Sequence, residues 1–356
     1  MQSEDAIVAV DLFCGVGGLT RGLLNSGIKV TMGVDLDPAC QFPLKKNNGV
    51  NFVEADVATL KSSDIKSAFG SSKITLMAGC APCQPFSTYS RSAKREKPHK
   101  DWGLLSAFSK LVLQVRPTLV TMENVPPLEK QKIFKDFITD LVNSGYAVDY
   151  SVVDCRSIGL PQSRKRLVLV ASSLGAINIP LSNRPMRTVR DAIGDLPPIS
   201  AGMTHPDDSL HMAASLSKTN LDRIRASKPG GTWRDWPDSL ISGCHMRESG
   251  ATFPSVYGRM QWDEPSPTIT TQCFGYGNGR FGHPEQDRAI SLREAAMLQG
   301  FPREYVFVPE GESGTFSTLG RLIGNAVPVS LGEFIGEVLV NHVAENRRAS
   351  EIGANH

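Results

Sequence analysis

Short apolar runs and amphipathic stretches alternate along the first half of the chain. The apolar runs have the length of buried strands and cover residues 7–13, 29–34, 50–53, 74–78 and 118–122. Between them, apolar residues recur every three or four positions, most clearly over residues 104–115 and 133–142. This alternation predicts an α/β fold built on a doubly wound, mostly parallel sheet of the Rossmann-like kind.

The pattern changes twice further along the chain. Two apolar runs, 147–153 and 166–171, have no helical stretch between them, so we expect antiparallel neighbours at one edge of the sheet. Proline, glycine, tryptophan and polar residues then become frequent, which predicts a smaller, loop-rich domain over residues 181–289. The large domain would comprise 1–180 and 290–356, and its last helix, over 331–339, is expected to pack beside the first strand.

Composition narrows the functional classes. The chain has 356 residues, of which 40% are hydrophobic, and a formal net charge of +2. None of its apolar runs approaches the roughly 20 residues needed to span a bilayer. The first residues lack the basic and apolar regions of a signal peptide. Seven scattered cysteines favour a reducing, cytoplasmic compartment, and without further close spacing they do not predict a zinc or other metal site.

Unusual polar clusters follow several predicted strands. They are the glycine turn at 15–18, Asp35, Asp56 and the pair Glu123–Asn124. Ligands of doubly wound sheets bind outside the carboxyl ends of the strands, so these clusters predict one common site. Asp35 lies 20 residues after Gly15, the usual place for a carboxylate that binds ribose hydroxyls. Because the third glycine of the dinucleotide fingerprint is replaced by Thr20, S-adenosylmethionine fits better than a dinucleotide.

Cys83 follows another of these strands, in a turn stiffened by Pro82 and Pro85. Such a turn can hold a thiol over a cleft, but two other interpretations remain open. Cys83 could be an ordinary buried cysteine, or Cys80 and Cys83 could form a thiol–disulfide redox pair. A cluster of basic residues comes directly afterwards and favours a polyanionic partner. It consists of Arg91, Lys94, Arg95, Lys97, His99 and Lys100.

Five segments resemble, in order and spacing, the motifs of the DNA cytosine-5 methyltransferase family, of the restriction–modification type. They are Asp11-Leu12-Phe13-Cys14-Gly15-Val16-Gly17-Gly18, Pro82-Cys83-Gln84-Pro85-Phe86-Ser87, Glu123-Asn124-Val125, Gln162-Ser163-Arg164-Lys165-Arg166 and Gly324-Asn325-Ala326-Val327-Pro328. The resemblance covers residues 8–340. Residues 181–256 lack such a motif, and in this family that region reads the DNA target.

The resemblance implies methyl transfer from S-adenosyl-L-methionine to C5 of a cytosine flipped out of double-stranded DNA, with S-adenosyl-L-homocysteine as product. Cys83 would add to cytosine C6. Glu123 would give a proton to N3, which asks for a carboxyl group kept protonated by burial. Asn124 would orient the loop or the base. We expect Arg164 and Arg166 on one face of a strand. One of them would bind cytosine O2 and hold Glu123, and the other would bind a phosphate. By resemblance, Arg164 is the one that lies nearest the base.

The family motifs also indicate binding residues. The predicted cofactor residues are Phe13, Gly15, Gly17, Gly18, Leu19, Asp35, Leu36, Asp56, Val57, Pro82, Leu105, Asn325 and Ala326. The predicted DNA contacts are Gln84, Ser87, Arg91, Lys94, Arg95 and Lys97. Many family members have glutamate and a bulky aromatic residue where this chain has Asp35 and Leu36.

Three competing functions remain at this point. A tRNA cytosine-5 methyltransferase shares these motifs, although Gly275 departs from that branch's Cys-Phe-Thr signature. A thiol–disulfide enzyme would use Cys80 and Cys83, and a catalytically idle DNA-binding module would need neither. For the methyltransferase we expect a monomer in the bacterial or phage-infected cytoplasm, associated with the nucleoid. It would have no membrane partner, and a cognate restriction endonuclease would act separately.

Overall fold

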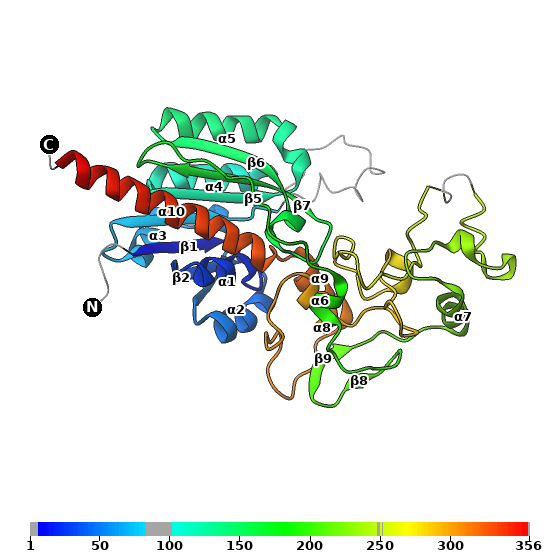
Figure 1. Ribbon diagram of the computed structural model, residues 1–356. Helices are drawn as coiled ribbons and strands as arrows, with labels where there is room; N and C mark the ends of the chain where they lie inside the picture. Colours follow the sequence, from blue (N-terminus) through cyan, green and yellow to red (C-terminus); the bar gives the residue numbers. More distant parts are fainter. Residues whose placement is uncertain (1–5, 83–101, 248–249, 251, 355–356) are drawn as a thin grey trace. The chain divides into compact units, whose positions relative to one another are not determined.

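The protein is described by a computed structural model that places residues 6–82, 102–247, 250 and 252–354 (Figure 1). The chain divides into two compact units. Unit 1 comprises residues 1–158, 165–183 and 327–356, and unit 2 comprises residues 159–164 and 184–326.

Unit 1 is built on a seven-stranded sheet in the order β3-β2-β1-β4-β5-β7-β6 (Figure 1). Its strands are β1 (Ile7–Leu12), β2 (Lys29–Asp35), β3 (Asn51–Glu54), β4 (Ile74–Gly79), β5 (Leu119–Asn124), β6 (Ala147–Asp154) and β7 (Lys165–Ser172). The first five strands pair in parallel, and β7 runs antiparallel to both β5 and β6. The predicted doubly wound, mostly parallel sheet and its antiparallel edge are therefore confirmed.

The helices of unit 1 follow the predicted amphipathic stretches. They are α1 (Gly18–Asn25), α2 (Gln41–Asn48), α3 (Ser62–Phe69), α4 (Trp102–Val115), α5 (Lys132–Asn143) and α10 (Val329–Ala354), with the short 3-10 helices η1 (Pro38–Cys40), η2 (Val57–Thr59), η5 (Pro126–Lys130) and η6 (Cys155–Ile158). Alternate residues of β1 face opposite sides of the sheet. Val8 and Val10 join the core formed with α3, α4 and α5, whereas Asp11 faces Thr20 on α1.

Helix α10 has α1 as its principal partner, whereas the sequence placed it beside the first strand. The two helices meet almost backbone to backbone. A Cβ atom on Gly22 would lie 2.3 Å from the backbone nitrogen of Glu333, and one on Gly332 would lie 2.8 Å from the carbonyl oxygen of Leu19. The Ser26 hydroxyl also donates a hydrogen bond of 2.9 Å to the carbonyl oxygen of Glu333. Glycine at these positions is what allows α10 to lie on α1.

Unit 2 contains little regular structure, as its composition predicts. Its elements are α6 (Val189–Ile193), β8 (Thr204–His205), β9 (Asp208–Met212), α7 (Lys218–Ala226), η7 (Trp233–Asp235), η8 (Asp238–Leu240), η9 (Tyr276–Asn278), α8 (Leu292–Leu298) and α9 (Phe316–Asn325). The compact unit ends later than the domain expected at 181–289, because α8 packs on α6, on β9 and on α9. Residues 290–326 therefore belong to unit 2.

A buried arginine, Arg259, links several segments of unit 2. The buried guanidinium of Arg259 donates hydrogen bonds to the carbonyl oxygens of Ile224, Ser227 and His283 and pairs with Asp287. Trp233 and Trp236 are 6% and 4% exposed. Their indole N–H groups donate to the Phe253 carbonyl oxygen and to the Ser227 hydroxyl, respectively. Both tryptophans are core residues.

One stretch within the described residues changes the expectation about membrane-length segments. Phe316–Glu351 is long and apolar enough, by length and composition alone, to cross a bilayer. In its most apolar window 72% is buried inside the protein, as in the core helix of a soluble protein. The stretch is therefore weak evidence for a membrane span.

We expect Gly22→Ala to lower the free energy of unfolding by about 3 kcal/mol, because the added Cβ overlaps the backbone of α10. Urea denaturation measures this change. Gly103→Ala is the matched control, since a Cβ there meets nothing within 4 Å, and should change stability by less than about 1 kcal/mol. Equal effects of the two substitutions would contradict the close contact between α1 and α10.

Candidate functional site

The turn after β1 is held in an unusual backbone conformation. Phe13, Gly15 and Gly17 all have positive φ angles, of 60°, 52° and 90°. Such a conformation is strained for a non-glycine residue such as Phe13 and is common at binding sites. A Cβ on Gly15 would meet nothing within 4 Å, so the backbone here is open to a ligand.

Asp35, at the end of β2, holds this turn in place. One oxygen of its carboxylate accepts a hydrogen bond of 2.8 Å from the Gly15 N–H, and the other accepts one of 3.0 Å from the Asp37 N–H. A carboxylate has about four lone-pair directions, so Asp35 keeps acceptor capacity for a ligand hydroxyl. The 20-residue spacing between Gly15 and Asp35 thus corresponds to a direct contact.

Apolar and acidic groups continue along the same edge of the sheet. Leu36 is 66% exposed, unusual for a leucine beside a buried strand, whereas Val57 and Leu105 are buried. Asp56 caps η2 by accepting a hydrogen bond of 2.9 Å from the Ala58 N–H. An exposed apolar face between two carboxylates suits a nucleoside, whose ring stacks while its hydroxyl and amino groups donate.

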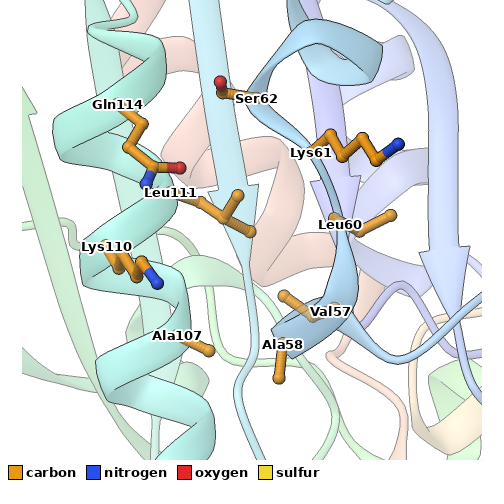
Figure 2. Close-up of a pocket in the computed structure, with 9 residues that line it drawn as sticks. All are labelled: Val57, Ala58, Leu60, Lys61, Ser62, Ala107, Lys110, Leu111 and Gln114. Carbon is orange, nitrogen blue, oxygen red and sulfur yellow. The ribbon is translucent and has the colours of Figure 1, made fainter.

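A cavity of about 330 Å³ adjoins these residues (Figure 2). It lies between η2, the start of α3 and α4, with Leu111 of α4 facing the segment of Val57 and Leu60. Two lysines, Lys61 and Lys110, also line it. It shares Val57 with the predicted cofactor residues, whereas Asp35, Leu36 and Leu105 are not among its lining residues.

Glu123, near the end of β5, carries the carboxyl group of the predicted catalytic residues, and this group is buried. It is 3% exposed and lies between two side chains from neighbouring strands. Arg166 of β7 places its Nε 2.8 Å from Oε1, an ion pair. The Cys80 thiol donates a hydrogen bond of 2.7 Å to Oε2. Within the described residues no N–H group is aligned with Oε1 well enough for a hydrogen bond, so that oxygen keeps an available lone pair.

Asn124 fixes the backbone that leads to Cys83. Its side-chain N–H donates a hydrogen bond of 2.9 Å to the carbonyl oxygen of Ala81, and its side-chain oxygen accepts one of 2.8 Å from the Val125 N–H. Of its two predicted roles, orienting the loop is the one that these contacts support. Pro82, two residues before the first predicted DNA contact, Gln84, is exposed.

The two arginines of the fourth motif belong to different units. Arg164 precedes β7, so it does not share a strand face with Arg166. Its buried guanidinium donates a hydrogen bond of 3.1 Å to the carbonyl oxygen of Ile269. It also donates hydrogen bonds of 3.4 Å to Oε1 of Gln162 and to Oε1 of Gln299, and all three acceptors belong to unit 2. Arg166 is thus the arginine that contacts Glu123, while the role of Arg164 beside the base stays a prediction.

Several other predicted residues belong to unit 2 or lie outside the described residues. Asn325 and Ala326 end α9 and belong to unit 2. Cys83 and the six predicted DNA contacts lie outside the described residues. Those contacts are Gln84, Ser87, Arg91, Lys94, Arg95 and Lys97.

Sequence reasoning missed the contact between Cys80 and Glu123. It considered Cys80 only as a redox partner of Cys83. The parallel register of β4 and β5 pairs Gly79 with Met122, so Cys80, the first residue after β4, lies beside Glu123 of β5. Aligning the predicted strands at their last residues, 78 and 122, would have placed Gly79 beside Glu123, so the pair depends on a register that the sequence pattern did not give.

Asp11 is a second group whose chemistry the sequence did not reveal. It is fully buried and accepts a hydrogen bond of 2.6 Å from the Thr20 hydroxyl on Oδ2. Its Oδ1 has no hydrogen-bond partner among the described residues. Burial raises the pKa of this carboxyl group to about 7, because water no longer stabilises the charge.

Comparisons with known proteins indicate the family. Residues 7–341 match the family model described as C-5 cytosine-specific DNA methylase. The type II methylase M.HgiDII of Herpetosiphon aurantiacus is 49% identical over 334 residues, which cover 92% of this chain and 93% of that protein. The type II methyltransferase M.Eco47II of Escherichia coli is 29% identical and covers 95% of this chain and 80% of its own length.

A solved structure supports the fold. A DNA modification methyltransferase encoded within an E. coli prophage superimposes with a TM-score of 0.74 at 24% identity. The match covers 94% of this chain and 99% of that one.

We expect the stability of the wild-type protein to fall, relative to Asp11→Asn, as pH rises from about 4 to about 7. In this range Asp11 is ionised in the unfolded chain and protonated in the folded protein, so folding takes up a proton. A higher pH therefore makes folding less favourable. A shift of roughly three pKa units corresponds to about 4 kcal/mol. Urea denaturation across this range, with the exposed Asp64→Asn as control, measures the difference; a difference that is constant with pH would contradict the assignment.

Proposed function

The chain belongs to the C-5 cytosine-specific DNA methylase family, and we propose that it methylates C5 of a cytosine turned out of double-stranded DNA. The observation that carries this proposal is the carboxyl group of Glu123, held between Cys80 and Arg166 where β5 ends. Asn124, the next residue, holds the backbone two positions before Cys83. The proposed proton donor and the backbone that leads to the proposed nucleophile are thus connected through Asn124.

The chemistry explains why a thiol and a carboxyl group are needed together. Cytosine C5 is a poor nucleophile. In the proposed reaction the Cys83 thiolate forms a bond to C6 while Glu123 gives a proton to N3, and the electron pair of the C5–C6 bond becomes available at C5. After C5 has gained the methyl group, a base removes the C5 proton, the Cys83–C6 bond breaks and the aromatic ring is restored.

The environment of Glu123 suits this role. Burial excludes water from the carboxyl group, and Oε1 keeps a lone pair that no described residue engages in a hydrogen bond. Arg166 keeps a cation within 2.8 Å, so the carboxylate left after proton transfer does not remain an unpaired buried charge. The proton can therefore move to the base and return.

The residues at the ends of β1, β2 and β3 fit S-adenosylmethionine, which when bound supplies a methyl group on a positively charged sulfur. Gly15 leaves its backbone open, and Asp35 retains acceptor capacity for ribose hydroxyls. Leu36 presents an exposed apolar face for adenine, and Asp56 lies beyond it at the end of β3. An aspartate and a leucine here can make these contacts although many relatives use longer side chains.

The alternatives have less support. A thiol–disulfide enzyme needs a reactive thiolate. Burial, and to a smaller extent the charge of Glu123, raises the pKa of the Cys80 thiol well above its usual value. A tRNA methyltransferase shares the motifs, but the 49% identical relative is named as a type II methylase. We further propose that unit 2 reads the DNA sequence, that the protein acts as a cytoplasmic monomer, and that a separate restriction endonuclease shares its target.

Expression in a host without cytosine methylation tests the function directly. We expect 5-methylcytosine at one short sequence of the host DNA, and methyl transfer in vitro to duplex DNA and not to tRNA. Cys83→Ser should lose turnover, because an alcohol does not add to C6 as a thiolate does, and should keep cofactor affinity. Methylation of tRNA alone, or full turnover by Cys83→Ser, would overturn the proposal.

A further inference from the structure

We propose that Cys80 is a positioning residue whose thiol fixes the carboxyl group of Glu123 in the orientation used to protonate cytosine. This inference rests on the function proposed above and adds a second cysteine to it. Cys80 does not touch the reacting atoms in this account; it acts through Glu123.

The sheet itself brings the two side chains together. Gly79 of β4 is in register with Met122 of β5, so Cys80 and Glu123 are the next residues of adjacent parallel strands. The backbone N–H of Cys80 donates a hydrogen bond of 3.2 Å to the carbonyl oxygen of Leu12. This bond anchors Cys80 to β1, which flanks β4 on the side opposite to β5. A separation of 2.7 Å between Sγ and Oε2 leaves no room for an intervening water. The contact is direct and rests on an anchored backbone.

The carboxyl group needs a second fixed point besides its arginine. The terminal torsion of a glutamate side chain is broad, so one contact leaves the plane of the carboxyl group free to turn. Arg166 lies against Oε1 without an aligned hydrogen bond, whereas Cys80 donates to Oε2. With a neighbour on each oxygen the plane is fixed, and the orientation of Glu123 toward the base becomes a property of the folded protein.

Two cysteines three residues apart would thus have separate tasks. Cys80 lies against a carboxylate, and desolvation makes its thiol hard to ionise, so it stays a hydrogen-bond donor at neutral pH. Cys83 is the residue proposed to add to the ring. This division predicts that a hydroxyl can replace the thiol of Cys80 but not that of Cys83.

Single-turnover methylation of duplex DNA by Cys80→Ala and Cys80→Ser tests the inference. Loss of the donor in Cys80→Ala should lower the maximal rate roughly tenfold, while affinities for DNA and S-adenosylmethionine stay unchanged. The pH profile of the rate should change as well, because the carboxyl group has lost its hydrogen bond from Cys80. Cys80→Ser keeps a donor and should restore both the rate, to within about threefold, and the pH profile.

Three controls separate positioning from a general structural effect. Cys155→Ala removes a buried thiol of unit 1, from η6, and should leave the rate and pH profile unchanged. In a Glu123→Gln background, Cys80→Ala should have little further effect, because the two residues act as one unit. Cys80→Val fills the volume without a donor and repeats the test if the alanine variant proves unstable.

The outcomes distinguish the two proposals. If the wild-type protein does not methylate DNA, the proposed function fails. If it does, but Cys80→Ala and Cys80→Val match its rate and pH profile, the inference about Cys80 is wrong. It is also wrong if Cys80→Ala slows the Glu123→Gln variant as much as it slows the wild type.

Discussion

The pairing of one buried carboxyl group with one arginine is the constraint on which the site depends. Glu123 is almost fully enclosed at the end of β5, where an unpaired carboxylate would be costly. Arg166 reaches it from β7, the strand that runs antiparallel to β5. Because β7 runs opposite to β5, its first residues lie beside the last residues of β5. Removing that strand would leave the carboxyl group without its cation.

The parallel strands of the sheet gather the remaining chemistry at the same edge. β1 ends in the strained turn that Asp35 of β2 holds through Gly15. β4 ends in Cys80, beside the end of β5. Each group is fixed by a neighbouring strand, so the order of the strands decides which groups can meet. Asp11 shows the cost of this arrangement, since this buried carboxyl group precedes the glycine turn and one of its oxygens has no hydrogen bond from any residue that the structure describes.

The sequence predicted most of the fold, because its signals are local. Apolar runs and amphipathic stretches gave every strand of the large sheet, and the missing helix before β7 gave the antiparallel edge. Unit 2 extends beyond the predicted boundary of the small domain, since α8 has a capping box but no signal in the sequence that says which unit it packs against. Likewise Gly22 and Gly332 carry no sign in the sequence of the helix contact that they allow.

The sequence indicated the polar residues at the strand ends but not their contacts. Glu123, Asn124 and Asp35 were found because polar residues at strand ends stand out. Which arginine holds Glu123 depends on where β7 begins, one residue after Arg164, and strand boundaries are not fixed by periodicity. The thiol of Cys80 was overlooked because its partner lies 43 residues away and only the strand register brings them together.

The central claim is that Cys83 adds to the pyrimidine while Glu123 and its partners manage the proton. Duplex DNA with 5-fluorocytosine at the target position tests this most directly, since fluorine does not leave C5 as a proton does and the covalent complex persists. Digestion and mass spectrometry of the trapped complex identify the modified residue. The account predicts one adduct, dependent on S-adenosylmethionine and carried by Cys83. An adduct on Cys80, or the absence of any adduct while ordinary target DNA is methylated, would contradict it.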